Sequence, residues 1–267
     1  MKTLIIQNVS TKEIRTVIQA VYLSDKDEYK VIRTDIQDLE KYKDVLETAI
    51  PIGSVEFVRK AMGIAWIKEP YIDPYPGYYE LLISGVNDLF SRDIYLDKVC
   101  KKNIQNFVGK FVKPTRLKQF NGFVYTDQDP IDEFTKEQKS IFESLVNDHV
   151  WVSDVVNFIS EFRYYIRDHK IIGYARYDEN EQEDVPEPDI TVIENYISVL
   201  SKCNFNFPYA LDFGVLDNNK TALVEFTDFW AIGLYGHALK PKEYLEMLIE
   251  RYEDIRHKGS MYSLDSF

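Results

Sequence analysis

The stretch LDFGVLDNNKTALVEFTD, residues 211–228, decides the fold, because it predicts a β-hairpin that carries carboxylates on one face. Alternating apolar residues flank a turn at Asn218 and Asn219, and asparagine tolerates the positive φ that tight two-residue turns require. With these two residues as the loop, Asp212 falls opposite Glu225. Like charges facing each other across two strands destabilise a sheet. Such a pair indicates either a shared proton or a bound cation.

The composition is that of an acidic globular protein. The chain has 267 residues, 45% of them hydrophobic, and a formal net charge of −12, which suits one large or two small domains. This charge argues against a broad electrostatic grip on nucleic acid or on an anionic membrane, while a local basic groove stays open. No segment approaches the roughly 20 apolar residues of a membrane span. Residues 1–10 offer only a short apolar run, so we expect no signal peptide.

The first hundred residues alternate strand-like and helix-like segments, as in an α/β unit. The expected strands cover residues 3–7 and 29–33, and the expected helices cover residues 11–22, 39–49 and 55–62. Residues 51–54 read as a loop in which Ser54 caps the third helix. The segment 70–78 is rich in Pro and Tyr and reads as another loop. We therefore expect an N-terminal α/β domain over residues 1–93.

Beyond residue 94 the pattern predicts a second region, 94–150, and a third, 151–267. The expected strands are 106–114, 122–125, 149–152, 160–167 and 171–177, and the expected helices are 135–147, 190–200 and 241–256. Thr135 and Gln138 have the spacing of a capping box. The run 178–189 carries seven acidic residues, two prolines and no basic residue, which is typical of a solvated loop.

Several common sites are absent from the sequence. It contains no phosphate-binding G-x-x-x-x-G-K-[ST] loop, no G-x-G-x-x-G and no G-x-S-x-G, and its four histidines lack ligand spacing. A different set of charged residues remains in addition to the hairpin carboxylates: Lys113, Lys118, Glu161, Arg163 and Arg176. Cations that neutralise phosphate oxygens and carboxylates that hold a metal suit a magnesium-bound triphosphate. A scatter of surface ion pairs is the alternative.

Five motifs together resemble the ATP-grasp superfamily. They are KFVKP (110–114), VWVSDVVNFISEFRYYI (150–166), GYARY (173–177), YALDFGV (209–215) and LVEFTDFWAIGLYG (223–236). More narrowly, they are similar to the phage and bacterial clade marked by one arginine and two lysines. The likeness covers about residues 51–256. It implies an α/β (α+β) ATP-grasp fold, with an N-terminal pre-ATP-grasp domain and two subdomains that sandwich a nucleotide.

The resemblance also implies roles for individual residues. The residues expected to bind ATP are Lys113, Lys118, Trp151, Val152, Ser153, Asp154, Glu161 and Arg163. The expected catalytic cations are Arg163, Arg176 and Lys118, and the expected magnesium ligands are Asp212, Glu225 and Asp228. The sequence departs from the family at two places, since Thr227 stands for the asparagine of E-x-N and Ala210 stands where many members have arginine. Arg163 or Arg176 is expected to supply that missing charge, and Asp228 to serve as third ligand only if the strand bulges or ends there.

The implied function is that of an ATP-dependent carboxylate–amine ligase, which modifies a peptide or protein through an acyl-phosphate with Mg-ATP. Its expected partners are small-molecule or peptide carboxylates and amines. The alternative is a catalytically degenerate nucleotide-binding protein of a phage or bacterium that serves in interactions. Cys100 and Cys203 lack metal-ligand spacing, which favours thiols in a reducing compartment. The expected location is the cytoplasm, that of the host if the protein is phage-encoded.

Overall fold

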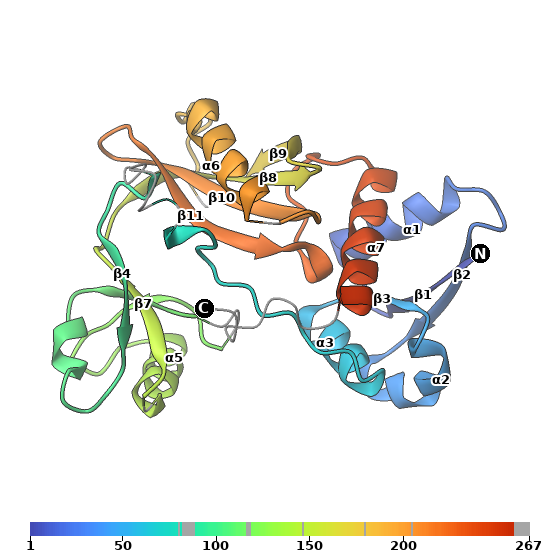
Figure 1. Ribbon diagram of the computed structural model, residues 1–267, viewed down its shortest axis with the longest axis horizontal. Coiled ribbons are helices and arrows are strands. Elements are labelled where there is room, and N and C mark those ends of the chain that lie inside the picture. Colours follow the sequence, from blue (N-terminus) through green and yellow to red (C-terminus); the bar gives the residue numbers. More distant parts are fainter. Residues whose placement is uncertain are drawn as a thin grey trace.

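The computed structural model describes residues 1–79, 81, 89–115, 119–145, 147–178, 180–203 and 205–258. The fold is mixed α/β and contains three sheets (Figure 1). One sheet lies in the N-terminal part, and the other two are each built from antiparallel strands. Lys118 lies outside the described residues, so its predicted role stays a prediction.

The N-terminal sheet is parallel, with strand order β2-β1-β3. Its elements in chain order are β1 (Lys2–Gln7), α1 (Lys12–Tyr22), β2 (Tyr29–Thr34), η1 (Ile36–Tyr42), α2 (Lys43–Leu46), β3 (Ile50–Ile52) and α3 (Val55–Ile64). Ser54 caps α3 as predicted, because its side chain accepts a hydrogen bond from the N–H of Phe57. The prediction of one helix over 39–49 and of a loop at 51–54 was wrong. The apolar residues 50–52 are buried beside β1 and form β3, the third strand of this sheet.

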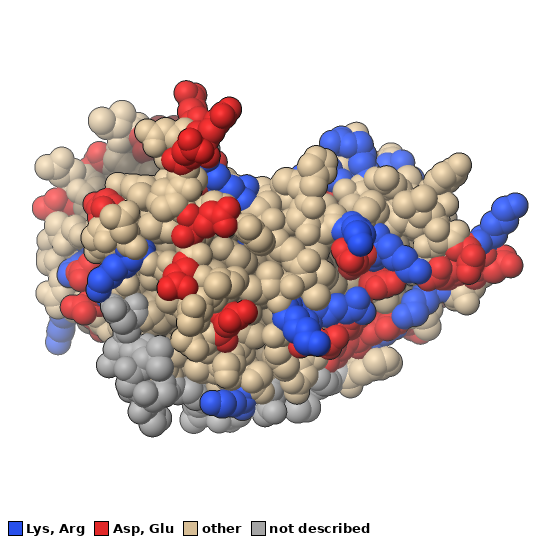
Figure 2. Space-filling view, turned by 90° about the horizontal axis from the view of Figure 1, so that it is seen from above, with Lys and Arg blue, Asp and Glu red and all other residues tan. Residues whose placement is uncertain are grey.

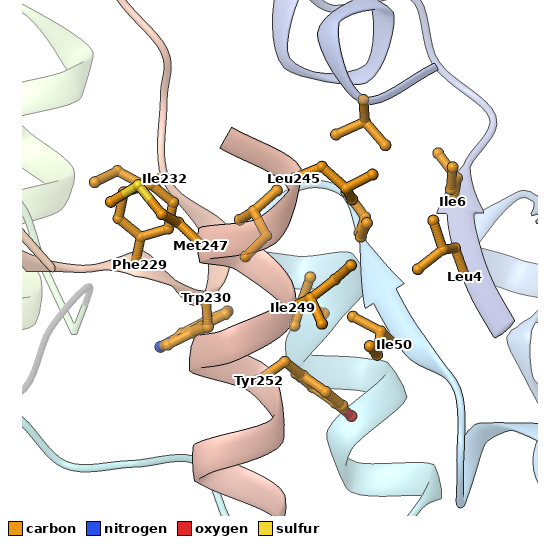
Figure 3. Packing of buried hydrophobic residues seen from close by; sticks show 14 of the residues in the cluster. Leu4, Ile6, Ile50, Phe229, Trp230, Ile232, Leu245, Met247, Ile249 and Tyr252 are labelled. Carbon is orange, nitrogen blue, oxygen red and sulfur yellow. The ribbon is translucent and has the colours of Figure 1, made fainter. Parts of the chain in front are cut away.

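The C-terminal helix α7 (Pro241–Lys258) packs against the N-terminal domain. Figure 3 shows Leu245 and Ile249 pointing from α7 toward β1 and β3, while Trp230 lies near the same helix. These side chains belong to one buried apolar cluster that joins the start of the chain to its end. Burial of such apolar area stabilises by about 25 cal/mol per Å². The N-terminal domain is thereby fixed relative to the large sheet described below.

The second sheet has strand order β4-β7-β5-β6 and is antiparallel. Its elements are β4 (Ile94–Lys98), η3 (Ile104–Phe107), β5 (Phe111–Pro114), β6 (Phe123–Val124), α5 (Glu133–Ser144) and β7 (His149–Ser153). The side chain of Asp132 caps α5 by accepting from the N–H of Thr135, so the predicted capping box starting at Thr135 was wrong. The proposed boundary at residue 150 falls inside β7.

The third and largest sheet has strand order β11-β10-β8-β9. Its elements are β8 (Phe158–Arg167), β9 (Lys170–Arg176), α6 (Ile190–Lys202), β10 (Tyr209–Leu216), β11 (Thr221–Asp228) and η4 (Phe229–Ala231). Phe162 and Tyr164 on β8 share an apolar cluster with Ile193 and Ile197 of α6. Helix α6 therefore covers one face of this sheet (Figure 1). The opposite face carries Asp212 and Glu225 of the hairpin.

The β10–β11 turn has three residues, one more than the sequence predicted. The loop comprises residues 217–219, and of these Asn219 alone has a positive φ, 62°. Asparagine tolerates this conformation, which closes three-residue hairpin loops. The longer loop shifts the pairing by one residue, and a bulge just beyond Asp212 shifts it back. Asp212 therefore faces Glu225, as predicted.

The face drawn in Figure 2 carries charged side chains of both signs. None of the helices in the described part of the chain is long and apolar enough to cross a bilayer. On the drawn face, lysines and arginines lie among aspartates and glutamates and form no continuous basic surface (Figure 2).

Candidate active site

Three charged residues lie in one row across the large sheet. Asp212 of β10 pairs with Glu225 of β11 on one side and with Arg163 of β8 on the other. Directly paired residues point to the same side of a sheet. Glu161, two residues before Arg163 on the same strand, points to that side as well. We name this side, opposite α6, the site face.

Arg163 and Asp212 form a buried bidentate ion pair. The Nε of Arg163 donates to Oδ1 of Asp212 at 2.7 Å, and Nη2 donates to Oδ2 at 2.6 Å. The two residues are only 7% and 1% exposed. Burial raises the pKa of Asp212, while the guanidinium opposes that rise. Both carboxylate oxygens hold short charge-assisted bonds, which is the geometry of an ionised pair.

A second cation–carboxylate pair joins the two antiparallel sheets. Lys113, on β5 of the second sheet, forms an ion pair with Glu225 of the large sheet, and the two side chains are 15% and 28% exposed. Burial disfavours the ammonium, but Glu225, Tyr75 and Asp212 together outweigh burial, so the pKa of Lys113 is raised. The Lys113 Nζ also lies 5.7 Å from the ring centre of Tyr75, a cation–π contact.

Two tyrosines cover the guanidinium of Arg163. The ring centres of Tyr177 and Tyr235 lie 5.6 Å and 5.1 Å from its Cζ. The two rings stack, with centres 5.0 Å apart and an angle of 26° between their planes. The hydroxyl of Tyr177 donates to Glu161 at 2.7 Å. Burial, with help from the nearby carboxylate of Asp212, raises the pKa of Glu161 above its usual range.

The segment that carries Tyr235 crosses the site face at close range. A Cβ at Gly173 of β9 would lie 1.8 Å from the carbonyl oxygen of Ala238, so glycine is needed there. The hydroxyl of Tyr165 donates to the carbonyl of Gly233 and accepts from the N–H of Tyr235, each at 3.0 Å. These contacts fix Tyr235 over Arg163 through its backbone.

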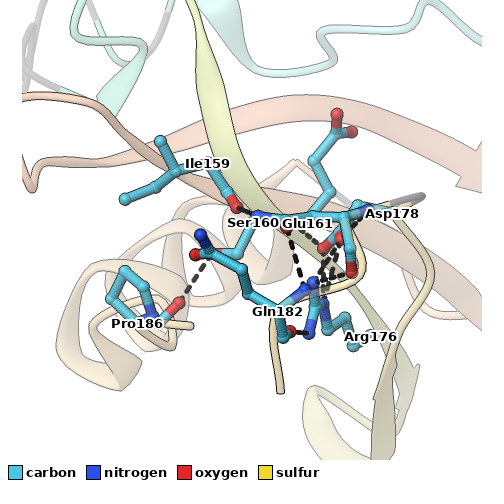
Figure 4. A network of polar contacts seen from close by, with 8 residues as sticks. Ile159, Ser160, Glu161, Arg176, Asp178, Gln182 and Pro186 are labelled. Carbon is cyan, nitrogen blue, oxygen red and sulfur yellow. Dashed lines mark hydrogen bonds and ion pairs between the residues drawn. The ribbon is translucent and has the colours of Figure 1, made fainter. Parts of the chain in front are cut away.

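The structure does not bring Arg176 to this site. Arg176 pairs with Phe162 across β8–β9 and therefore points to the α6 side of the sheet, away from Arg163. Figure 4 shows its guanidinium binding the acidic segment that follows β9. Its Nη2 donates to Asp178 at 2.7 Å, and its Nη1 donates to the carbonyl of Gln182 at 2.5 Å. The expectation that Arg176 joins the catalytic cations is therefore contradicted by its position.

Asp228 also lies away from the other carboxylates. It is three residues after Glu225 on β11, so strand alternation turns it to the opposite face. Both of its carboxylate oxygens accept from Arg251 of α7, at 2.6 Å and 2.7 Å. Asp228 is 4% exposed and Arg251 is 0% exposed. The bulge that could have redirected Asp228 lies before Glu225. The expectation that Asp228 is a metal ligand is therefore corrected.

The residues expected to contact adenine and ribose lie in β7 and just after it: Trp151, Val152, Ser153 and Asp154. Trp151 pairs with Lys113 across β7–β5 and so points to the same side. The next two residues are buried, at 0% and 4% exposure. The carboxylate of Asp154 accepts from Lys110 at 2.6 Å. Trp151 and, two residues further along β7, Ser153 share the side that carries the site lysine.

The charged row fits a hard divalent cation. Asp212 and Glu225 place two carboxylates at paired positions, and Mg²⁺ is bound by one or two carboxylates together with substrate phosphates and water. Thr227, two residues beyond Glu225, adds a buried Oγ1 with no hydrogen-bond partner in the described structure. Among the described residues, no group of three or more His, Cys, Asp or Glu side chains lies close enough together to hold a metal ion. The remaining ligands would come from water and substrate.

The sequence itself matches a family model over residues 89–247, more than half of the chain. The model describes an ATP-grasp domain of R2K clade family 2. The chain is an ATP-grasp protein. A comparison with curated proteins returned no match.

Solved structures of other ATP-grasp proteins share the fold. D-alanine–D-alanine ligase from Bacillus anthracis in complex with ATP has a TM-score of 0.54 and 15% identity, over 97% of this chain and 99% of that chain. N5-carboxyaminoimidazole synthetase from Staphylococcus aureus has a TM-score of 0.55 and 10% identity, over 94% and 77%. The ATP-grasp ligase PsnB complexed with a minimal precursor has a TM-score of 0.51 and 9% identity, over 94% and 99%. At these identities the likeness establishes the fold alone.

Sequence reasoning missed three tyrosines of the candidate site, Tyr75, Tyr177 and Tyr235. Strand alternation could have found Tyr177, because it follows two residues after Ala175, the strand partner of Arg163. Tyr235 lies beyond the hairpin, where no periodic pattern marks its direction. Tyr75 sits in a segment whose Pro and Tyr content indicated a loop and nothing more.

Proposed function

We propose that this ATP-grasp protein is an ATP-dependent carboxylate–amine ligase. One observation carries the proposal. Two cations from two different sheets, Lys113 and Arg163, meet two carboxylates, Glu225 and Asp212, at adjacent positions of one hairpin. Cations suited to phosphate and carboxylates suited to a metal are thus both present and balance each other in charge.

Both ion pairs would exchange partners when Mg-ATP binds. In the structure each carboxylate neutralises a cation. Breaking the buried Arg163–Asp212 pair alone would leave a charge uncompensated, at a cost of about 3–5 kcal/mol. If the carboxylates turn to the metal while Lys113 and Arg163 turn to phosphate oxygens, every charge keeps a partner. We therefore expect nucleotide and metal to bind cooperatively, each weakly without the other.

The chemistry requires no protein nucleophile. A carboxylate oxygen of the substrate takes the γ-phosphoryl group and ADP leaves; an amine nitrogen then attacks the acyl carbon and phosphate leaves. Lys113 and Arg163 would hold the phosphate oxygens in line and stabilise the charge that develops on them. Magnesium, when bound, would neutralise further charge on the transferring group. The substrates would be small-molecule or peptide carboxylates and amines, met in the cytoplasm.

Glu225→Gln tests this proposal, with Glu183→Gln in the exposed acidic segment as the matched control. Glutamine keeps the size of Glu225 but removes the charge that the metal needs. We expect this change to abolish magnesium-dependent formation of ADP across a panel of amino acids and peptides, with the fold retained by circular dichroism. The control should turn over ATP like the wild type. Unchanged turnover in the Glu225 variant would refute the metal assignment.

A second candidate is a protein that binds nucleotide without turning it over. The observation that favours it is the lack of a third metal ligand beside Asp212 and Glu225. Thr227 stands where the E-x-N motif has asparagine, and Asp228 is bound to Arg251. Thermal shift with ATP and magnesium separates the two candidates. Stabilisation without ADP formation across the same panel would favour the binding protein.

A further inference from the structure

One loop, residues 72–77, contacts both sheets that supply the site charges, and we name it the bridging loop (Figure 1). On the large sheet, the N–H of Phe226 donates to the carbonyl of Pro74 at 2.9 Å, one residue beyond Glu225. The hydroxyl of Tyr196 on α6 donates to a second carbonyl of the loop at 2.6 Å. The bridging loop is thereby fixed beside the strand that carries Glu225.

On the second sheet, the bridging loop reaches Lys113 through Asp73. One carboxylate oxygen of Asp73 accepts from the indole N–H of Trp151 at 3.0 Å, and the other accepts from the N–H of Tyr75 at 2.7 Å. The rings of Tyr75 and Trp151 meet edge to face, with centres 5.3 Å apart at 90°. Trp151 is the strand partner of Lys113, and Tyr75 holds its ammonium in a cation–π contact.

The carboxylate of Asp73 is suited to this arrangement because it offers an acceptor to each of two N–H groups. An asparagine at this position would offer one oxygen and turn an NH₂ group toward the other donor. Burial raises the pKa of Asp73 to about 6, while its two hydrogen bonds and the charge of Lys113 oppose the rise. The titratable groups that face it are Lys113 and, from α6, Tyr196.

We propose that Asp73 is a positioning residue, which fixes Trp151 and Tyr75 and so sets where Lys113 meets Glu225. The contacts reach the lysine from two sides, through its strand neighbour and through the ring above its ammonium. The effect of Asp73 on ATP binding rests on the proposed function, in which Lys113 binds the phosphate oxygens. The consequence for Lys113 itself does not, and it can be measured without nucleotide.

Asp73→Asn tests the positioning role, with Tyr196→Phe as the matched control. The control removes another anchor of the bridging loop that does not contact Lys113. The readout is the rate at which an amine-selective acylating reagent labels Lys113, followed by mass spectrometry. Lys110, whose side chain is 37% exposed and bound to Asp154, serves as internal reference.

In Asp73→Asn we expect faster labelling of Lys113, because asparagine cannot accept from both Trp151 and Tyr75 and so holds them less firmly beside the lysine. Tyr196→Phe should label like the wild type. Trp151→Phe keeps an aromatic ring but removes one donor to Asp73. In this variant the labelling rate of Lys113 should also rise, but by less. If Lys113 is labelled at the same rate in Asp73→Asn, in Trp151→Phe and in the wild type, the positioning role is overturned.

Nucleotide kinetics extend the same test. In the wild type, the KM for ATP should rise as the pH falls through about 6, because protonated Asp73 no longer accepts both bonds. Asp73→Asn should lose this acid limb and have a KM about tenfold higher at neutral pH, the loss of about one charged hydrogen bond, with less change in kcat. If Mg-AMP-PNP fails to protect Lys113 from labelling in the wild type, the proposed function fails while the positioning result stands.

Discussion

Two aspartates of the large sheet form buried pairs with arginines, and the two pairs have the same geometry but different surroundings. Arg163–Asp212 and Arg251–Asp228 each make two hydrogen bonds of 2.6–2.7 Å. The first pair lies on the site face, next to the ion pair that joins the two sheets. The second lies on the other side of β11, where the guanidinium is also bound to Asp254 of α7.

The difference teaches that the direction of a strand residue, and not its distance along the sequence, decides its role. Asp228 is nearer in sequence to Glu225 than Asp212 is, yet it points away from it. Asp212 lies opposite Glu225 and has the site cations beside it. We therefore expect Arg251–Asp228 to serve stability alone, and Arg163–Asp212 to respond to metal and nucleotide.

The largest expected effect comes from breaking the structural pair. Arg251→Met should lower the free energy of unfolding by about 3–5 kcal/mol, because Asp228 keeps a buried charge without its guanidinium. Urea denaturation measures the loss, and added magnesium should not restore it. The double change Arg251→Met with Asp228→Leu should recover much of the stability, since neither charge remains. A variant as stable as the wild type would show that this pair contributes nothing.

The corresponding change at the site face should behave differently. Arg163→Met should lower the free energy of unfolding by about 3 kcal/mol, because Asp212 keeps a buried charge without its guanidinium. Here magnesium at ten- to thirtyfold above its Kd should restore about 1–2 kcal/mol, because Asp212 and Glu225 gain a cation in place of the guanidinium. Thermal unfolding with and without magnesium checks this. Equal effects of magnesium on the Arg163 and Arg251 variants would remove the distinction between the two pairs.

The smallest effect is expected at Thr227, on the side of β11 that carries Glu225. Its Oγ1 is buried without a hydrogen-bond partner in the described structure. Thr227→Val, which has almost the same shape, should therefore raise the free energy of unfolding by about 1 kcal/mol without metal. With magnesium and AMP-PNP, the variant should gain less stabilisation than the wild type. An equal gain would show that the hydroxyl takes no part in the metal site.

The sequence allowed part of the fold and of the candidate site to be predicted, because those parts rest on local patterns. The period of two along residues 211–228 placed Asp212 opposite Glu225, although the turn has three residues, since the bulge cancels the shift. The motif order indicated the ATP-grasp fold, which the family model supports. The predicted turn length was wrong because Asn219 alone supplies the positive φ.

The remaining parts depend on contacts between distant residues, for which the sequence gives no local signal. Asp73 and Trp151 are 78 positions apart. The partner of Asp228 lies on a helix that packs against the N-terminal domain, so only the assembled fold shows that this carboxylate is occupied. The wrong position of Arg176 has a different cause, because a local pattern was present and was not applied. Ala175 is the strand partner of Arg163, so strand alternation turns Arg176, the next residue, to the α6 side.

The central claim is that the site-face pair exchanges partners when Mg-ATP binds and that the structural pair does not. Nitrogen NMR of the arginine Nε–H groups measures this directly, because both Arg163 and Arg251 donate from Nε to a buried carboxylate. With magnesium and AMP-PNP added together, we predict that the Nε–H signal of Arg163 shifts and exchanges faster with solvent, while that of Arg251 stays unchanged. An unchanged Arg163 signal under saturating nucleotide would contradict the account.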